Sequence, residues 1–137
     1  MSDVIQVGDR YTKQFVYSQA DVEAFAQVTG DHNPVHLDPD YAATTVYKKP
    51  IIHGMLGASA FSTIFGNEFP GEGTVFLSHS FSFRRPMYVG LAYEAICEVV
   101  EVNPDRHKAV IKTTMMNVAD GKPVLQGEAA LINKSRF

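Results

Sequence analysis

Residues 30–39 offer the most chemistry in this chain, because they place Asp31 and two imidazoles within one short segment. Asp31 and His36 lie five residues apart, and Pro34 between them keeps the preceding Asn33 out of the helical region. The segment therefore predicts a turn rather than one continuous helix. A chain that folds back here could bring the Asp31 and His36 side chains to one point.

An acid and an imidazole that meet at one point can hold and activate a water molecule. The imidazole has a reference pKa of about 6.5, and a carboxylate stays ionised near neutral pH. The structural alternative is that Asp31 forms an Asx turn with the local backbone and that His36 is solvated or hydrogen-bonded in the core. Taken by itself, the segment favours this structural alternative.

A metal site is a second alternative for the same segment. His32 and His36 have the i, i+4 spacing of zinc ligands on a helix. Asp38 or Asp40 could complete such a set. The spacing places both imidazoles on one face only within a helix, and Pro34 argues against a helix across this segment. We therefore expect no metal here.

Two predicted helical segments flank residues 30–39 and hold this connection at both ends. Before it, Ser18 and Asp21 resemble a capping box, and apolar residues at helical spacing continue to Gly30, a natural C-terminal stop. After it, Asp38 can cap a new turn that begins with Pro39 at the first helical position. The candidate acid and imidazole are thus expected in a short connection between helices.

A second segment adds an anion-binding feature. Residues 56–65 are apolar or small, and no charge occurs before Glu68, which indicates a helix in the protein interior. His53 and Gly54 precede it. Gly54 lets a ligand approach the backbone closely, and the free N–H groups of a helix N-terminus favour negative charge on that ligand. An oxyanion hole for a thioester carbonyl requires this arrangement. The alternative is a plain turn before a core helix.

Together these segments resemble the hydratase-2 motif of the MaoC-like (R)-specific enoyl-CoA hydratases. The matching residues are Gly30, Asp31, Asn33, Pro34, His36, Asp38, Ile52, His53, Gly54, Met55 and Ser62. The resemblance extends over essentially the whole chain and includes residues 82–86 and 127–129.

The resemblance implies reversible addition of water to a trans-2-enoyl-CoA, as in fatty acid metabolism, giving an (R)-3-hydroxyacyl-CoA without a metal or redox cofactor. It implies that Asp31 accepts a proton from the attacking water, that His36 holds this water and assists proton delivery, and that the Gly54 amide stabilises the thioester oxygen. Which of the pair donates the proton to C2 is left open. Further residues expected at the substrate site are Asn33, His53 and Ser62.

The resemblance also implies a single hotdog domain over residues 1–137, in which an antiparallel sheet wraps a central helix and two subunits join sheet to sheet. The residues themselves predict one strand, then helices, then four antiparallel strands, which is an α+β order. Residues 74–85 alternate in polarity, and we expect His79 on their apolar face to be a hydrogen-bonded core or interface histidine. Residues 120–121 predict a hairpin. The predicted strands are residues 11–17, 74–85, 93–102, 109–118 and 124–132.

Two basic pairs and one aromatic residue could contact the ends of such a substrate. Lys48-Lys49 and Arg84-Arg85 could bind CoA phosphates, although short basic pairs are usually solvated. Phe65 lies about one helical turn beyond Ser62, which is expected at the substrate site. Its ring could therefore close the acyl pocket and favour chains of about four to six carbons. The alternative is that Phe65 simply packs in the core.

Composition narrows the remaining choices. The 137 residues are 45% hydrophobic, which fits one globular domain with a core of its own. A net charge of −3 and the lack of a basic run argue against a nucleic-acid partner. No stretch resembles a signal peptide or a membrane span, so we expect a cytoplasmic protein. Cys97, the only cysteine, is expected in the core.

Three functions remain open: a hydratase, a thioesterase and an acyl-CoA sensor. The sequence also leads to an expectation about the oligomeric state. A hotdog thioesterase would hydrolyse the same class of thioester with a carboxylate, and an acyl-CoA sensor would bind it without turnover. The presence of both Asp31 and His36 favours the hydratase, since a module that needs only affinity has no use for a water-activating pair. We expect a homodimer, because a second copy can cover an open strand edge.

Overall fold

The computed structural model describes residues 4–137, and its five strands form one antiparallel sheet. The strand order is β1-β3-β4-β5-β2, so β1 and β2 are the two edges. All five strands predicted from the sequence are present, with ends that differ by at most two residues. Their bounds are β1 Arg10–Val16, β2 Val75–Phe83, β3 Ala92–Asn103, β4 Lys108–Asn117 and β5 Pro123–Ile132.

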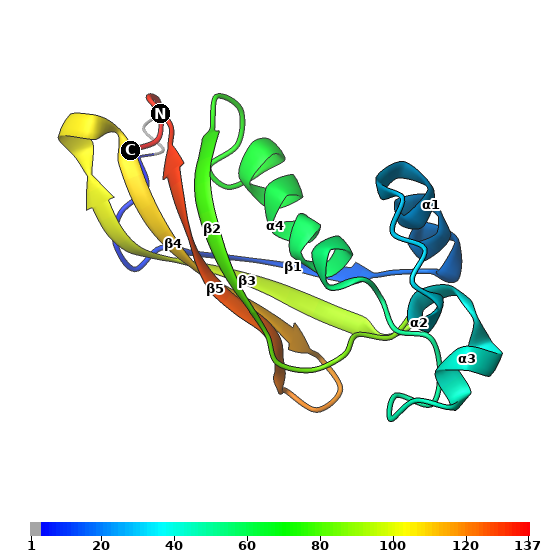
Figure 1. The fold of residues 1–137 in the computed structure, drawn as a ribbon. Helices are drawn as coiled ribbons and strands as arrows, with labels where there is room; N and C mark the ends of the chain where they lie inside the picture. The colour runs from blue at the N-terminus through cyan, green and yellow to red at the C-terminus, as the bar shows by residue number, and fades with distance from the viewer. Residues whose placement is uncertain (1–3) are drawn as a thin grey trace.

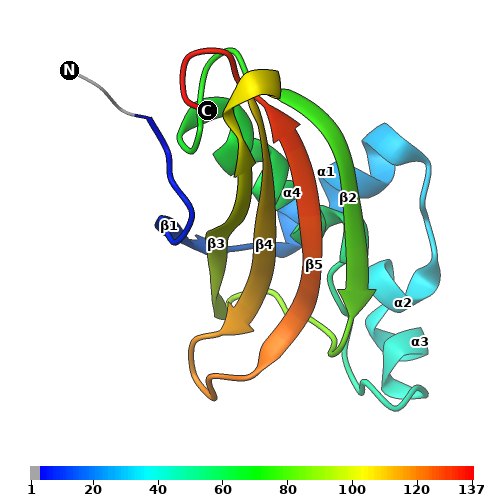
Figure 2. The same ribbon diagram turned by 90° about the vertical axis from the view of Figure 1, so that its left-hand side faces the viewer.

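Four helices accompany the sheet. The sheet curves around the long helix α4, whereas the other three lie together beyond the N-terminal end of α4 (Figures 1 and 2). This is the α+β hotdog arrangement that the resemblance implied. The bounds of the helices are α1 Gln19–Thr29, α2 Pro34–Leu37, α3 Pro39–Ala43 and α4 Gly54–Asn67, and a single 3-10 turn covers Pro104–Arg106.

The core lies between α4 and the concave face of the sheet. Alternate residues of β3 and β4 are buried and pack against the buried side of α4. Cys97 is among them, as expected, and burial raises the pKa of its thiol to about 12. The largest buried side chains of this core include Phe61, Ile64, Phe65, Tyr93, Ile111, Met115 and Leu131.

One side of α4 is not covered by the described residues, which corrects the expectation of a wholly interior helix. Met55 is 55% exposed, and Ser59, Ser62 and Thr63 are exposed with it. Ser59 donates its hydroxyl to the Leu56 carbonyl, so part of this polarity is satisfied within the helix. The exposed side is therefore made of small or flexible residues, and the sequence did not distinguish them from a buried set.

The edge strand β2 departs from strict alternation. Its pairing with β5 shifts register between Phe76 and Ser78, which marks a bulge. The Phe76 ring consequently packs 5.4 Å from Phe65 and 5.6 Å from His79, in a place that alternation would give to Leu77. Leu77 is 46% exposed. Strict alternation over residues 74–85 would place Leu77 on the apolar face with His79, and this expectation is wrong because periodicity does not reveal a bulge.

Candidate active site

The end of α1 delivers Asp31. The predicted capping box is present, since Ser18 and Asp21 each accept a hydrogen bond from the other's backbone N–H. Gly30 ends the helix with φ +80°, a conformation that glycine adopts without strain. Asp31 follows with one carboxylate oxygen, Oδ1, accepting from the Asn33 N–H at 3.3 Å. The Asx turn of the structural alternative therefore forms, and the other carboxylate oxygen has no hydrogen bond within residues 4–137.

One helical turn, α2, delivers His36. Asn33 has ψ 123°, outside the helical region as predicted, and its side chain accepts from the Val35 N–H at 3.2 Å. Pro34 occupies the first position of α2, where its missing N–H costs nothing. The sequence predicted the turn but not this short helix. Asn33 thus acts here as a helix cap.

The hydrogen bond of the His36 ring fixes its tautomer. Nδ1 lies 2.8 Å from the Ile51 carbonyl oxygen, which can only accept, so Nδ1 carries the hydrogen. Burial lowers the pKa of His36 below its ordinary 6.5, and the nearby His53 lowers it further, against the raising effects of Ile51 and Asp31. His36 is therefore neutral at neutral pH, and its Nε2 offers a lone pair.

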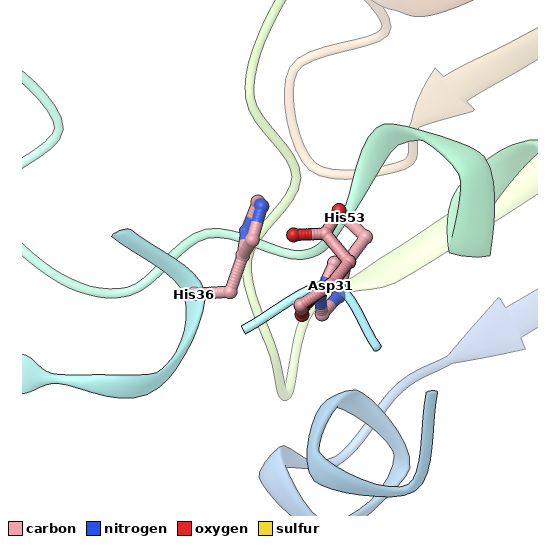
Figure 3. A group of neighbouring side chains, drawn as sticks. All are labelled: Asp31, His36 and His53. Carbon is pink, nitrogen blue, oxygen red and sulfur yellow. Dashed lines mark hydrogen bonds between the residues drawn. The ribbon is translucent and has the colours of Figure 1, made fainter. Parts of the chain in front are cut away.

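Asp31, His36 and His53 come together although three separate segments carry them (Figure 3). One oxygen or nitrogen from each side chain lies within 4.8 Å of the other two. The His36 and His53 rings stack with centroids 3.9 Å apart, and His53 Nε2 lies 3.0 Å from the Asp31 carbonyl oxygen. The sequence paired Asp31 with His36 correctly in space. The resemblance placed His53 at the substrate site, but nothing in the sequence indicated that its ring contacts this pair.

This group lies at a cavity of about 540 Å³. Gly54 also lines the cavity, and as the first residue of α4 its N–H has no hydrogen bond within the described part of the chain. A Cβ at Gly54 would lie 2.7 Å from Cε1 of Phe83, so a side chain fits there only if the Phe83 ring moves. The cavity therefore offers two proton acceptors and a free backbone donor. Such a set can activate a water and stabilise an oxyanion.

The remaining candidates are divided between the cavity and other places. Arg84 and Arg85 line the cavity, and Arg84 Nε donates to Gln126 Oε1 at 3.1 Å. The Lys49 ammonium lies 5.0 Å from the centre of the Tyr88 ring. The predicted site residues that do not line this cavity are Asn33, Lys48, Ser62 and Phe65.

His79 also lies away from the cavity. Its Nε2 is 2.7 Å from Thr113 Oγ1, and burial lowers the pKa of the ring to about 4. It is therefore a neutral, hydrogen-bonded histidine, as expected. The aromatic rings around it are Phe61, Phe65, Phe76 and Phe81.

The metal alternative takes a different form in the structure. Among residues 4–137, one group of potential metal ligands is close enough together to share an ion. It consists of Asp31, His36 and His53, so His53 takes the place that the sequence analysis gave to His32. In that group, Nδ1 of His36 and Nε2 of His53 already hydrogen-bond to carbonyls. Nδ1 of His53 is buried from solvent. Two accessible ligands remain, fewer than zinc sites use.

The sequence analysis missed several residues of the cavity, among them Ile51 and Phe83. Ile51 contributes a backbone carbonyl, which carries no signal in residue type. Phe83 was placed on an alternating strand and within the resembling residues 82–86, but not among the site residues, yet its ring lies against Gly54 and it is 54% exposed. An aromatic residue at a strand end is too common a feature to have been singled out.

Comparisons with known proteins agree with this geometry. A model of the MaoC-like domain family matches residues 5–121. The (R)-specific enoyl-CoA hydratase of Aeromonas caviae is 39% identical over 93% of this chain and 94% of its own length. The 3-hydroxybutyryl-CoA dehydratase of Methylorubrum extorquens is 40% identical over 82% of this chain and 70% of its own length.

A solved structure extends the likeness to the whole fold. The (R)-hydratase from A. caviae involved in PHA biosynthesis superposes with a TM-score of 0.90 at 38% identity. The match covers 94% of this chain and 97% of that one.

Within the described residues, no helix has the length and apolar character that crossing a bilayer requires.

Proposed function

The chain belongs to the MaoC-like domain family, and from this premise we propose that it is an (R)-specific enoyl-CoA hydratase. It would reversibly add water to a trans-2-enoyl-CoA and give an (R)-3-hydroxyacyl-CoA. The relatives' names describe both directions of this reaction, hydration and dehydration. The observation that carries the proposal is the approach of Asp31 and His36 beside the free amide of Gly54.

We propose that one water binds between the Asp31 carboxylate and Nε2 of His36, donating a hydrogen bond to each. Asp31 accepts a proton as the water oxygen forms its bond to C3. Neutral His36 has its hydrogen on Nδ1, bonded to Ile51, so it has no proton on Nε2 to give. The proton that reaches C2 on the same face is then the one that Asp31 took from water.

The developing charge needs a partner at the thioester oxygen. As water adds to C3, negative charge moves through C2 to the carbonyl, giving an enolate-like species. The Gly54 N–H at the start of α4 is the proposed donor to this oxygen. The addition transfers protons but changes no oxidation state overall. We therefore propose that the enzyme uses no redox cofactor, that the Gly54 amide rather than a metal ion stabilises the thioester oxygen, and that CoA enters only as part of the substrate.

Crotonyl-CoA tests this function against its two alternatives. A hydratase removes the absorbance of the conjugated enoyl thioester while the thioester bond stays intact, and chiral analysis should return the (R)-3-hydroxy product. A thioesterase would instead release a free CoA thiol. An acyl-CoA sensor would bind without turnover. Thiol release without loss of the double bond, or binding alone, would exclude the proposed function.

We also propose that the enzyme is a homodimer joined along β2. This edge strand contains no Asp, Glu, Lys or Arg and exposes several apolar side chains, whereas the other edge, β1, carries Arg10 and Lys13. An uncharged edge strand readily pairs with another chain, and a two-fold pair of copies closes it. Because β2 ends at Phe83 beside Gly54, two equivalent cavities would lie near the interface. The exposed apolar residues of β2 are Val75, Phe76, Leu77 and Phe83.

Four finer proposals concern the substrate's ends and the protein's location. Arg84 and Arg85, at the cavity, are proposed contacts for the CoA phosphates, since guanidinium groups suit such ligands. A preference for short acyl chains, attributed to the Phe65 ring, remains a proposal, as does the role of Lys48. The cytoplasmic location expected from the sequence also stays a prediction.

A further inference from the structure

We propose that His53 is a positioning residue, which holds Asp31 and His36 in place relative to the Gly54 amide and does not itself contact the substrate. The inference rests on the proposed hydratase activity. It replaces the expectation that His53 binds the substrate. Its basis is that one buried side chain contacts both members of the catalytic pair and immediately precedes the oxyanion donor.

The first contact is with the backbone of Asp31. Nε2 of His53 lies 3.0 Å from the Asp31 carbonyl oxygen. That oxygen can only accept, so Nε2 carries the hydrogen and donates. The bond joins the start of α4 to the loop after α1, which are 22 residues apart in the chain. It therefore fixes where the Asp31 carboxylate stands relative to α4.

The second contact is with the ring of His36. The two imidazoles stack with centroids 3.9 Å apart and an angle of 28° between their planes. The Phe25 ring lies 4.8 Å from His53 and supports it from α1. His53 itself is only 2% exposed. The His36 ring thus rests on a rigid surface, and its hydrogen bond to Ile51 fixes the remaining rotation.

The third link runs through the backbone of His53. Its carbonyl oxygen accepts from the N–H groups of Leu56 at 3.0 Å and Gly57 at 3.2 Å, which closes the first turn of α4. Gly54 is the first residue of that turn. The orientation of the Gly54 amide is therefore tied to the same residue that holds Asp31 and His36.

Neither nitrogen of His53 is free to take part in the reaction. Nε2 is committed to the Asp31 carbonyl. Nδ1 is buried and has no hydrogen-bond partner among the described residues. A buried acceptor without a partner lowers stability, so a purely apolar side chain would suit packing alone better. The histidine is explained by what its Nε2 hydrogen holds in place.

Two substitutions separate the hydrogen bond from the ring. His53→Phe keeps a ring for His36 to stack on and removes the donor, whereas His53→Gln keeps an amide N–H near the position of Nε2. With crotonyl-CoA, we expect His53→Phe to lower kcat by about 10- to 100-fold while KM changes by less than about two-fold, since small displacements of reacting groups carry such losses. We expect His53→Gln to stay within about ten-fold of the wild-type kcat.

A rise in KM with kcat unchanged in His53→Phe would overturn the proposal, because it would assign His53 to substrate binding. A wild-type kcat and KM in His53→Phe would overturn it as well. Thermal melting verifies that the variants fold. If His53→Phe does not fold, His53→Gln decides: a folded His53→Gln that loses more than about 100-fold in kcat contradicts the proposal, and retained kcat supports it.

A double variant tests whether His53 acts through Asp31. If His53 only positions Asp31 and its partner, His53→Phe should cost much less in an Asp31→Asn background than in the wild type. Fully additive losses would mean an independent role and would overturn the proposal. An inactive wild type would refute the hydratase activity itself, whereas an active wild type with an unaffected His53→Phe refutes only the role of His53.

Discussion

At the residue scale, the proposed chemistry depends on two acceptors that face one water. We predict that Asp31→Asn and His36→Gln each lower kcat for crotonyl-CoA by about 10²–10⁴-fold, the usual range for general acid–base groups. Both substitutions preserve shape, and Asp31 is exposed while His36 is half-buried, so melting temperatures should change little. A folded Asp31→Asn enzyme with near-normal hydration would remove Asp31 from the mechanism.

The lowered pKa of His36 determines where kcat/KM falls on the acid side of its pH profile. Protonation would place a second hydrogen on the ring, at Nε2, and abolish its lone pair. Because burial lowers the pKa of His36, this loss should occur below its ordinary 6.5 as pH falls. We predict that kcat/KM declines as pH falls, with the midpoint of this decline below 6.5.

A variant outside the cavity provides the control for this profile. His79→Gln should leave the acid side unchanged, since His79 does not line the cavity. A wild-type midpoint at or above 6.5 would contradict the assignment of this limb to His36.

Residue type and spacing made Asp31, His36 and Gly54 candidates, and the family resemblance selected them over the structural alternatives. The same reasoning could not find the tertiary contacts that orient them. The bond from His53 to the Asp31 carbonyl spans 22 residues, and the acceptor for His36 is a main-chain oxygen of Ile51. Backbone acceptors leave no trace in the sequence, so the orientation of a site is less predictable than its members.

At the element scale, the start of α4 must keep a free amide and an open backbone. We predict that Gly54→Ala lowers kcat by roughly ten-fold, since its Cβ would lie 2.7 Å from the Phe83 ring and push this side chain over the oxyanion site. Phe83 is 54% exposed and can move, so the fold should survive.

Gly66→Ala is the matched control on the same helix. A Cβ at Gly66 would meet nothing within 4 Å, so alanine should stabilise α4 by up to about 1 kcal/mol without changing kcat. Steady-state kinetics and thermal melting of the two variants give the comparison. Equal kcat values in both would argue against a constraint at Gly54.

The prediction about acyl length also belongs to α4. Phe65 is 1% exposed, and Phe65→Ala should destabilise the fold by about 3–5 kcal/mol. If its ring also closes the acyl site, the variant should gain relative kcat/KM for an eight-carbon over a four-carbon enoyl-CoA. Phe65→Leu provides a milder change if the alanine variant is too unstable. Unchanged selectivity in a folded variant would leave Phe65 as a core residue only.

Elements differ in how much of them could be predicted. The bounds of α1 followed from Ser18, Asp21 and Gly30, since caps act through neighbours in the chain. Strand positions followed from composition and turn residues. The bulge at Leu77 did not, because register depends on how β2 meets β5. Likewise, the exposed side of α4 could not be predicted, since a helix of small and apolar residues reads the same whether or not a neighbour covers it.

At the scale of the whole molecule, the charge difference between the two sheet edges decides where a second copy should bind. We predict that the wild-type protein scatters light as a particle of twice the 15.1 kDa chain mass at micromolar concentration.

Leu77→Lys places a charge on the proposed interface, where the side chain is 46% exposed, and should shift the mass toward that of one chain. Val16→Lys is the matched control, because Val16 is 60% exposed on β1 and its substitution should leave the dimer intact. Because β2 also carries Phe83 to the cavity, dissociation by Leu77→Lys should lower hydration activity in parallel. A fully active wild-type protein of monomeric mass would rule out this assembly, and dissociation by Val16→Lys alone would place the interface on β1 instead.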